Sequence, residues 1–107
     1  MAGFYKKRQI ITPETPFKVG EIYNYGTVCP SQWFAITKCG RMIYVRYRCG
    51  RLTLTVGEPN ILEEANAVCG DLIYEKYVGD EMDGYMTFNE LKNHCFGVVV
   101  WPEKESV

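Results

Sequence analysis

The sequence lacks the arrangements of cysteine and histidine that bind zinc or crosslink a small fold. Its 107 residues include five cysteines and one histidine. The cysteines are odd in number, and no two of them form a C-x-x-C pair. Both facts argue against a disulfide framework and against a zinc knuckle. We therefore expect no structural metal and no cofactor.

Long apolar runs are missing as well. No stretch approaches the roughly 18 apolar residues of a membrane-spanning helix, and no hydrophobic segment follows the basic N-terminus as in a signal peptide. We therefore expect a soluble, cytoplasmic protein with free thiols and no membrane association. A chain of this length is expected to form a single domain over residues 1–107, with residues 1–4 and 103–107 frayed.

The motifs of common enzyme classes are also absent. The sequence contains no G-x-S-x-G, no glycine-rich phosphate loop and no H-E-x-x-H. The only histidine, His94, precedes Cys95 in a segment with helical signals. Neighbouring side chains of a helix point about 100° apart, so these two are poorly placed to act as base and nucleophile. We expect a non-enzymatic protein with no catalytic residue.

Acidic residues are missing from one long stretch. None occurs between Ile22 and Gly57. Residues 1–57 carry nine Lys or Arg and two Glu, for a net charge of +7, whereas residues 58–107 have a net charge of −8. In one interpretation of this asymmetry, the basic half binds anions and the acidic half binds a partner. In the alternative interpretation, the acidic half folds over the basic half and the charges complement each other internally.

The strongest structural signal lies in this stretch, from Trp33 to Val56. Runs rich in β-branched and aromatic residues alternate with Cys39-Gly40 and Cys49-Gly50. Glycine in the second position of a two-residue loop is typical of a tight hairpin, so we expect three antiparallel strands across residues 33–56. Because side chains alternate between faces, two-residue loops predict one apolar core face. Its members are Phe34, Ile36, Ile43, Val45, Tyr47, Leu52, Leu54 and Val56.

The opposite face of this meander is the candidate binding surface. Arg46, Arg48 and Arg51 offer planar, forked donors for carboxylate or phosphate. Trp33 and Tyr44 offer stacking surfaces, and the predicted register puts Trp33 beside Arg46 for a cation–π contact. In the alternative interpretation, these are ordinary sheet residues, with Trp33 packed under a helix or the N-terminal arm.

The flanking segments predict an α+β fold, in which further strands extend the antiparallel sheet and two short helices pack on one of its faces. Helices are expected near residues 60–69, with Asn60 as N-cap, and near residues 88–95, where Thr87 and Glu90 form a capping-box pattern. Further strands are expected at residues 5–11, 21–28, 72–78 and 98–101.

Residues 79–90 resemble an EF-hand calcium loop. Asp83 stands at the fifth place of that loop and Glu90 at the twelfth, where the family has a bidentate carboxylate. Gly79 occupies the first place, where the family has an aspartate. The resemblance implies calcium ligands at Glu81, Asp83 and Glu90, whereas the alternative is an acidic turn followed by a capped helix.

Together these features favour a small interaction domain that docks on a protein partner through the basic, aromatic sheet face. In size and composition the chain is similar to small inhibitor or immunity-type proteins, and arginine and aromatic residues are frequent anchors of interfaces. Two alternatives stay open: binding of single-stranded nucleic acid or another polyanion by the same face, and calcium binding by residues 79–90. The sequence does not predict the oligomeric state.

Overall fold

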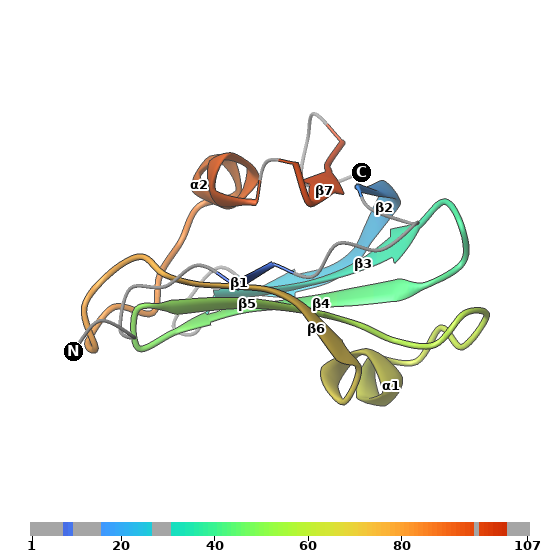
Figure 1. Cartoon of the computed structure of the whole chain (residues 1–107), viewed down its shortest axis with the longest axis horizontal. Helices are drawn as coiled ribbons and strands as arrows, with labels where there is room; N and C mark the ends of the chain where they lie inside the picture. The colour runs from blue at the N-terminus through green and yellow to red at the C-terminus, as the bar shows by residue number, and fades with distance from the viewer. Residues whose placement is uncertain (1–7, 10–15, 27–30, 96, 103–107) are drawn as a thin grey trace.

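The computed structural model describes residues 8–9, 16–26, 31–95 and 97–102 (Figure 1). Within them, seven strands form a sheet in the order β1-β6-β5-β4-β3-β2-β7. All pairings are antiparallel except that of β2 with β7. The sheet is accompanied by two short helices, which confirms the predicted α+β class. The strands are β1 (Arg8–Gln9), β2 (Phe17–Gly26), β3 (Ser31–Thr37), β4 (Met42–Arg48), β5 (Arg51–Val56), β6 (Asp71–Tyr77) and β7 (Val99–Val100), and the helices are α1 (Glu64–Val68) and α2 (Phe88–His94).

The β4–β5 hairpin has the predicted register. Arg48 lies directly opposite Arg51, and Tyr47 opposite Leu52. The two loop residues, Cys49 and Gly50, have φ angles of 55° and 72°. Positive φ at both central positions is what a type I′ turn requires, and this turn matches the twist of the strands that it joins.

The predicted register of the β3–β4 hairpin is wrong by one residue. Ile36 lies opposite Met42. The Thr37 N–H group donates to the carbonyl of Arg41 (2.8 Å), and the Gly40 N–H group donates to the carbonyl of Thr37 (3.1 Å). Gly40 has a φ of 87°, so the loop has three residues and closes on a left-handed glycine. One extra loop residue moves every side chain of β3 to the other face of the sheet.

The main core lies on the face of the sheet that α2 covers. The register change places Trp33 and Ala35 in it, both fully buried, whereas the predicted core residues Phe34 and Ile36 face the other side. The remaining six predicted core residues are buried as expected. They are Ile43, Val45, Tyr47, Leu52, Leu54 and Val56.

Helix α2 begins with the predicted capping box. The Thr87 hydroxyl accepts a hydrogen bond from the Glu90 N–H group (3.2 Å), and the Glu90 carboxylate accepts one from the Thr87 N–H group (2.9 Å). These bonds satisfy two N–H groups that a helix start leaves without partners. The helix then packs Phe88 and Leu91 into the main core.

Helix α1 lies on the opposite face of the sheet (Figure 1), so the prediction that both helices share one face is wrong. The physical reason is again the register of β3, which turns Phe34 to the second face, where it packs with Met42 and with Ala67 of α1. The helix is also shorter than predicted. Asn60 is not its N-cap, because Asn60 has a φ of 66° and its N–H group donates to a loop carbonyl. Glu63 occupies the N-cap position without a side-chain hydrogen bond.

The other predicted strands are present in the described residues, with shifted bounds. Strand β6 matches the strand predicted at residues 72–78. Strand β2 begins earlier than predicted, and β1 and β7 cover two residues each. The rest of the predicted strand at residues 5–11 and the termini that we expected to fray lie outside the described residues.

The fold has the dimensions of a small compact domain. Its Cα radius of gyration of 12.9 Å is close to the value of about 13 Å for a folded chain of some 100 residues. Neither helix of the described residues is long and apolar enough to cross a membrane.

Candidate functional site

Helix α1 covers only part of its face of the sheet. Near the helix, the Thr55 hydroxyl donates to the carbonyl of Ala67 (2.6 Å), and Phe34 and Met42 pack against the helix. Toward the β4–β5 hairpin the same face carries polar and charged side chains and is hollowed. Within the described residues no helix covers this end of the sheet, which is the candidate site.

An open hollow of about 330 Å³ occupies that end of the sheet. Its residues come from three neighbouring strands and from the β4–β5 turn, and we call it the arginine hollow. Cationic side chains make up half of its lining, so it favours an anionic ligand. The lining residues are Arg46, Arg48, Cys49, Arg51, Thr53 and Tyr77.

Two of the three arginines face each other across the hairpin. Arg48 and Arg51 are directly opposite residues of β4 and β5, and Tyr77 of β6 lies opposite Arg51. Like charges at directly opposite positions destabilise a pair of antiparallel strands. The Glu75 carboxylate beside Arg51 offsets part of this repulsion, and an anion bound in the hollow would offset more of it.

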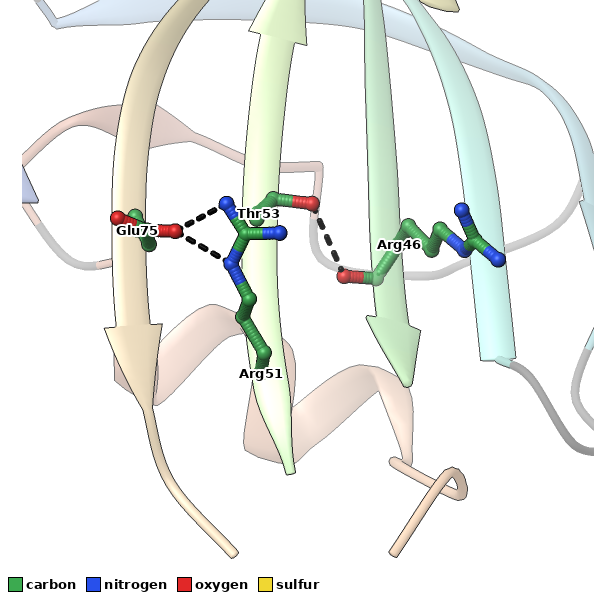
Figure 2. Close-up of polar contacts among 4 residues, drawn as sticks. All are labelled: Arg46, Arg51, Thr53 and Glu75. Carbon is green, nitrogen blue, oxygen red and sulfur yellow. Dashed lines mark hydrogen bonds and ion pairs between the residues drawn. The ribbon is translucent and has the colours of Figure 1, made fainter. Parts of the chain in front are cut away.

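One arginine is held by a buried carboxylate. Figure 2 shows the Arg51 guanidinium group turned toward Glu75 of β6, where its Nε and Nη2 atoms both donate to the carboxylate. The Glu75 side chain is only 8% exposed, against 46% for Arg51. Because a buried carboxylate without a partner is costly, this ion pair keeps Arg51 in one position. The acidic half of the chain thus compensates part of the basic face, as the alternative interpretation of the charges anticipated.

The other two arginines are not compensated in this way. Within the described residues, the guanidinium groups of Arg46 and Arg48 form no hydrogen bond and no ion pair. In Figure 2 the Arg46 side chain extends toward β3, away from Arg51, and only its backbone carbonyl bonds to Thr53.

An acidic loop borders the tip of the hairpin. The Gly50 N–H group donates to the carbonyl of Asp83 (2.7 Å), and the Tyr47 hydroxyl donates to the Asp83 carboxylate (2.6 Å). Burial and the neighbouring Asp83 raise the pKa of Tyr47 far above its ordinary value, so this donor keeps its proton. The loop is therefore fixed against the turn, and the backbone carbonyl of its exposed residue Asp80 lies close to Gly50.

The two aromatic residues of the predicted site lie elsewhere. Trp33 is fully buried in the main core, on the face opposite Arg46, so the predicted cation–π contact is wrong. Tyr44 is on the predicted face, but its ring packs against Phe34 at 4.8 Å between centroids and its hydroxyl donates to Gln32 (3.3 Å). Neither ring is a free platform for stacking.

The sequence did not point to the β6 residues of the site. Tyr77 lines the hollow and Glu75 holds Arg51 because β6 pairs with β5. The strand itself was predicted, and its alternating pattern would have placed Glu75 and Tyr77 on one face. Its pairing partner and register could not be read from that pattern.

The carboxylates of the loop that resembles an EF-hand do not converge. Asp83 accepts the hydrogen bond of Tyr47, whereas Glu90 caps the start of α2 through Thr87. The described part of the chain contains no group of three or more His, Cys, Asp or Glu side chains arranged to hold a metal ion, and Glu81 belongs to no such group.

Cys95 is a structural thiol. It is fully buried, its Sγ donates to the carbonyl of Leu91 (2.9 Å), and it accepts a hydrogen bond from Trp101 Nε1 (3.0 Å). Burial raises the pKa of Cys95 to about 11. Burial also lowers the pKa of the neighbouring His94. A thiol that stays protonated is a poor nucleophile, so this pair offers no activated cysteine.

The chain matches no protein-family model, no curated protein and no solved structure. Function therefore has to be inferred from the side chains of the site.

Proposed function

We propose that this protein is a non-enzymatic interaction domain whose arginine hollow docks an acidic segment of a protein partner. The observation that carries this function is the direct opposition of Arg48 and Arg51 at the edge of an uncovered hollow. A sheet that served only to fold would gain stability from a neutral or oppositely charged residue at one of these positions. An anion bound between the two guanidinium groups would offset that cost.

The residue types around the hollow suit a protein interface. Arginine, tyrosine and methionine are enriched in such interfaces, and arginine and tyrosine are frequent hot spots. Tyr77 lines the hollow and is 37% exposed. A partner segment that places a carboxylate in the hollow would thus contact this aromatic ring.

The same surroundings favour a protein over a nucleic acid. Proteins that bind single strands combine a basic track with aromatic platforms for the bases. Trp33 is buried and Tyr44 is packed against Phe34, so the two predicted platforms are not free.

The test is a titration of the protein with a short, fluorescein-labelled peptide rich in glutamate, at low ionic strength. We compare the wild type with the double variant Arg46→Gln/Arg48→Gln and with the matched control Lys18→Gln/Lys38→Gln. The control removes the same charge from exposed lysines beside the β3–β4 hairpin, at the other end of the sheet.

We expect the arginine variant to lose about tenfold or more in affinity and the lysine variant to lose little, since charge-assisted hydrogen bonds contribute about 1.5–3 kcal/mol each. Equal losses in the two variants would mean that net charge, and not the hollow, attracts the peptide. Such a result would contradict the proposed function.

A further inference from the structure

We infer that the arginine hollow recognises a phosphorylated side chain of the partner, an inference that rests on the proposed docking of an acidic segment. A phosphate monoester differs from a carboxylate in its charge and in its number of acceptor oxygens. Both differences match features of the hollow.

The charge of the lining exceeds that of one carboxylate. Arg46, Arg48 and Arg51 line the hollow, and Glu75 compensates one of the three positive charges. A bound aspartate or glutamate would supply a single negative charge and leave one arginine uncompensated. A phosphorylated side chain carries about −1.5 to −2 at neutral pH and would compensate both.

The arginine N–H donors that Glu75 does not occupy are more numerous than one carboxylate can bind. A guanidinium group has five N–H donors in a fixed fork, and Glu75 occupies only one edge of Arg51. The forks of Arg46 and Arg48 are unoccupied within the described residues. Phosphate has three strong acceptor oxygens and accepts bidentate bonds from arginine, so it can engage more of these donors at once when the Arg46 side chain turns from β3 toward the hollow.

The size of the hollow fits a single modified side chain. Its volume of about 330 Å³ is at the low end of the range of about 300–1,000 Å³ for small-molecule sites. Strands β4, β5 and β6 form its floor, and the exposed ring of Tyr77 lies at one side, opposite Arg51. A phosphate group and the side chain that bears it fill such a space, whereas a folded domain cannot enter it.

The experiment measures fluorescence anisotropy with three labelled peptides of one neutral sequence, which carry phosphoserine, glutamate or serine at the central position. The protein variants are wild type, Arg48→Gln and the lysine control Lys18→Gln/Lys38→Gln. Circular dichroism confirms that each variant is folded. Inorganic phosphate and a short oligothymidylate serve as competitors.

We expect the phosphoserine peptide to bind wild type about tenfold or more tightly than the glutamate peptide. Arg48→Gln should remove most of that difference, and the lysine control should keep it. Affinity for the phosphoserine peptide should also fall as the pH is lowered through about 6, where phosphate takes up a second proton. The glutamate peptide, whose pKa is about 4.3, should change little over the same range.

The other outcomes overturn the inference in distinguishable ways. If the phosphoserine and glutamate peptides bind equally and both depend on Arg48, docking of an acidic segment stands and phosphate recognition fails. If neither binds at low salt, the proposed function fails with it. If inorganic phosphate binds as tightly as the phosphopeptide, the hollow is a site for free phosphate. Tighter binding of oligothymidylate would identify a nucleic-acid site.

Discussion

Replacement of Arg48 by a neutral residue should make the free protein more stable while weakening its anion binding. Arg48 lies directly opposite Arg51 in the β4–β5 hairpin. Cross-strand pairs contribute about 0.2–1 kcal/mol, and like charges at such positions are destabilising. Arg48 is exposed, Arg51 is 46% exposed, and Glu75 pairs with Arg51, so solvent and this carboxylate both weaken the repulsion. We therefore expect Arg48→Gln to gain about 0.2–0.3 kcal/mol, at the low end of that range.

The assay is urea denaturation at low salt, supported by thermal melting. A gain of this size raises the melting temperature by about 1–2 °C in a domain of some 100 residues. Arg48→Lys keeps the charge and serves as the control, for which we expect no gain. In about 1 M salt the Debye length shrinks to about 3 Å, and the difference between wild type and Arg48→Gln should largely disappear.

The reasoning would be refuted if Arg48→Gln were no more stable than wild type at low salt. The Arg48–Arg51 pair would then store no repulsion, and the hairpin would offer no physical reason to expect an anion. A gain that persisted unchanged at high salt would equally rule out a charge effect, because screening acts on the charges alone.

Three further predictions concern the fold. Burial raises the pKa of Cys95 from 9.0 to about 11. The stability that the buried, protonated thiol contributes is therefore complete below pH 9 and is lost as the pH rises to about 11. Over that range, wild type should lose roughly 2–3 kcal/mol more than Cys95→Ala in urea titrations, and equal losses would contradict the assignment. Thr87→Ala should cost about 1 kcal/mol, whereas Thr87→Ser keeps the cap and should cost less; equal costs would argue against the capping box. Gly50→Ala should destabilise more than Gly97→Ala, since both residues have positive φ but only at Gly50 would a Cβ atom collide with the carbonyl of Asp80. Equal melting temperatures would contradict this packing of the hairpin tip.

The two hairpins show why part of the fold could be predicted from sequence and part could not. Both loops contain the tripeptide Cys-Gly-Arg, and the sequence predicts two-residue turns for both. Only Cys49-Gly50 forms one. In the other loop, the Thr37 hydroxyl accepts from the Arg41 N–H group (2.9 Å), and the carbonyl of Gly40 accepts from the distant Asn60 N–H group (2.7 Å). The first of these bonds is local to the loop and the second is tertiary, and together they stabilise the three-residue turn.

The extra residue in the β3–β4 loop accounts for the main errors of the prediction from sequence. It moved Trp33 from the predicted binding face into the core and turned Phe34 to the face that α1 covers. The positions of Arg46, Arg48 and Arg51 were predicted correctly because they depend only on the β4–β5 turn.

The remainder of the site depends on long-range pairing. Glu75 and Tyr77 reach the arginine hollow because β6 pairs with β5, and that pairing contains a register shift at Leu54 and Thr55. An alternating pattern predicts that a strand exists and which residues share a face. It cannot identify the neighbour of that strand or an irregularity in their register.

The most direct test of the docking site is a ¹⁵N–¹H NMR titration of the whole protein with the glutamate-rich peptide. If the arginine hollow is the docking site, the shifted amides should cluster on the β4–β5 hairpin and the facing part of β6, including Arg48, Cys49, Arg51 and Tyr77. Shifts centred on Lys18 and Lys38 at the other end of the sheet, or spread evenly over the surface, would contradict it.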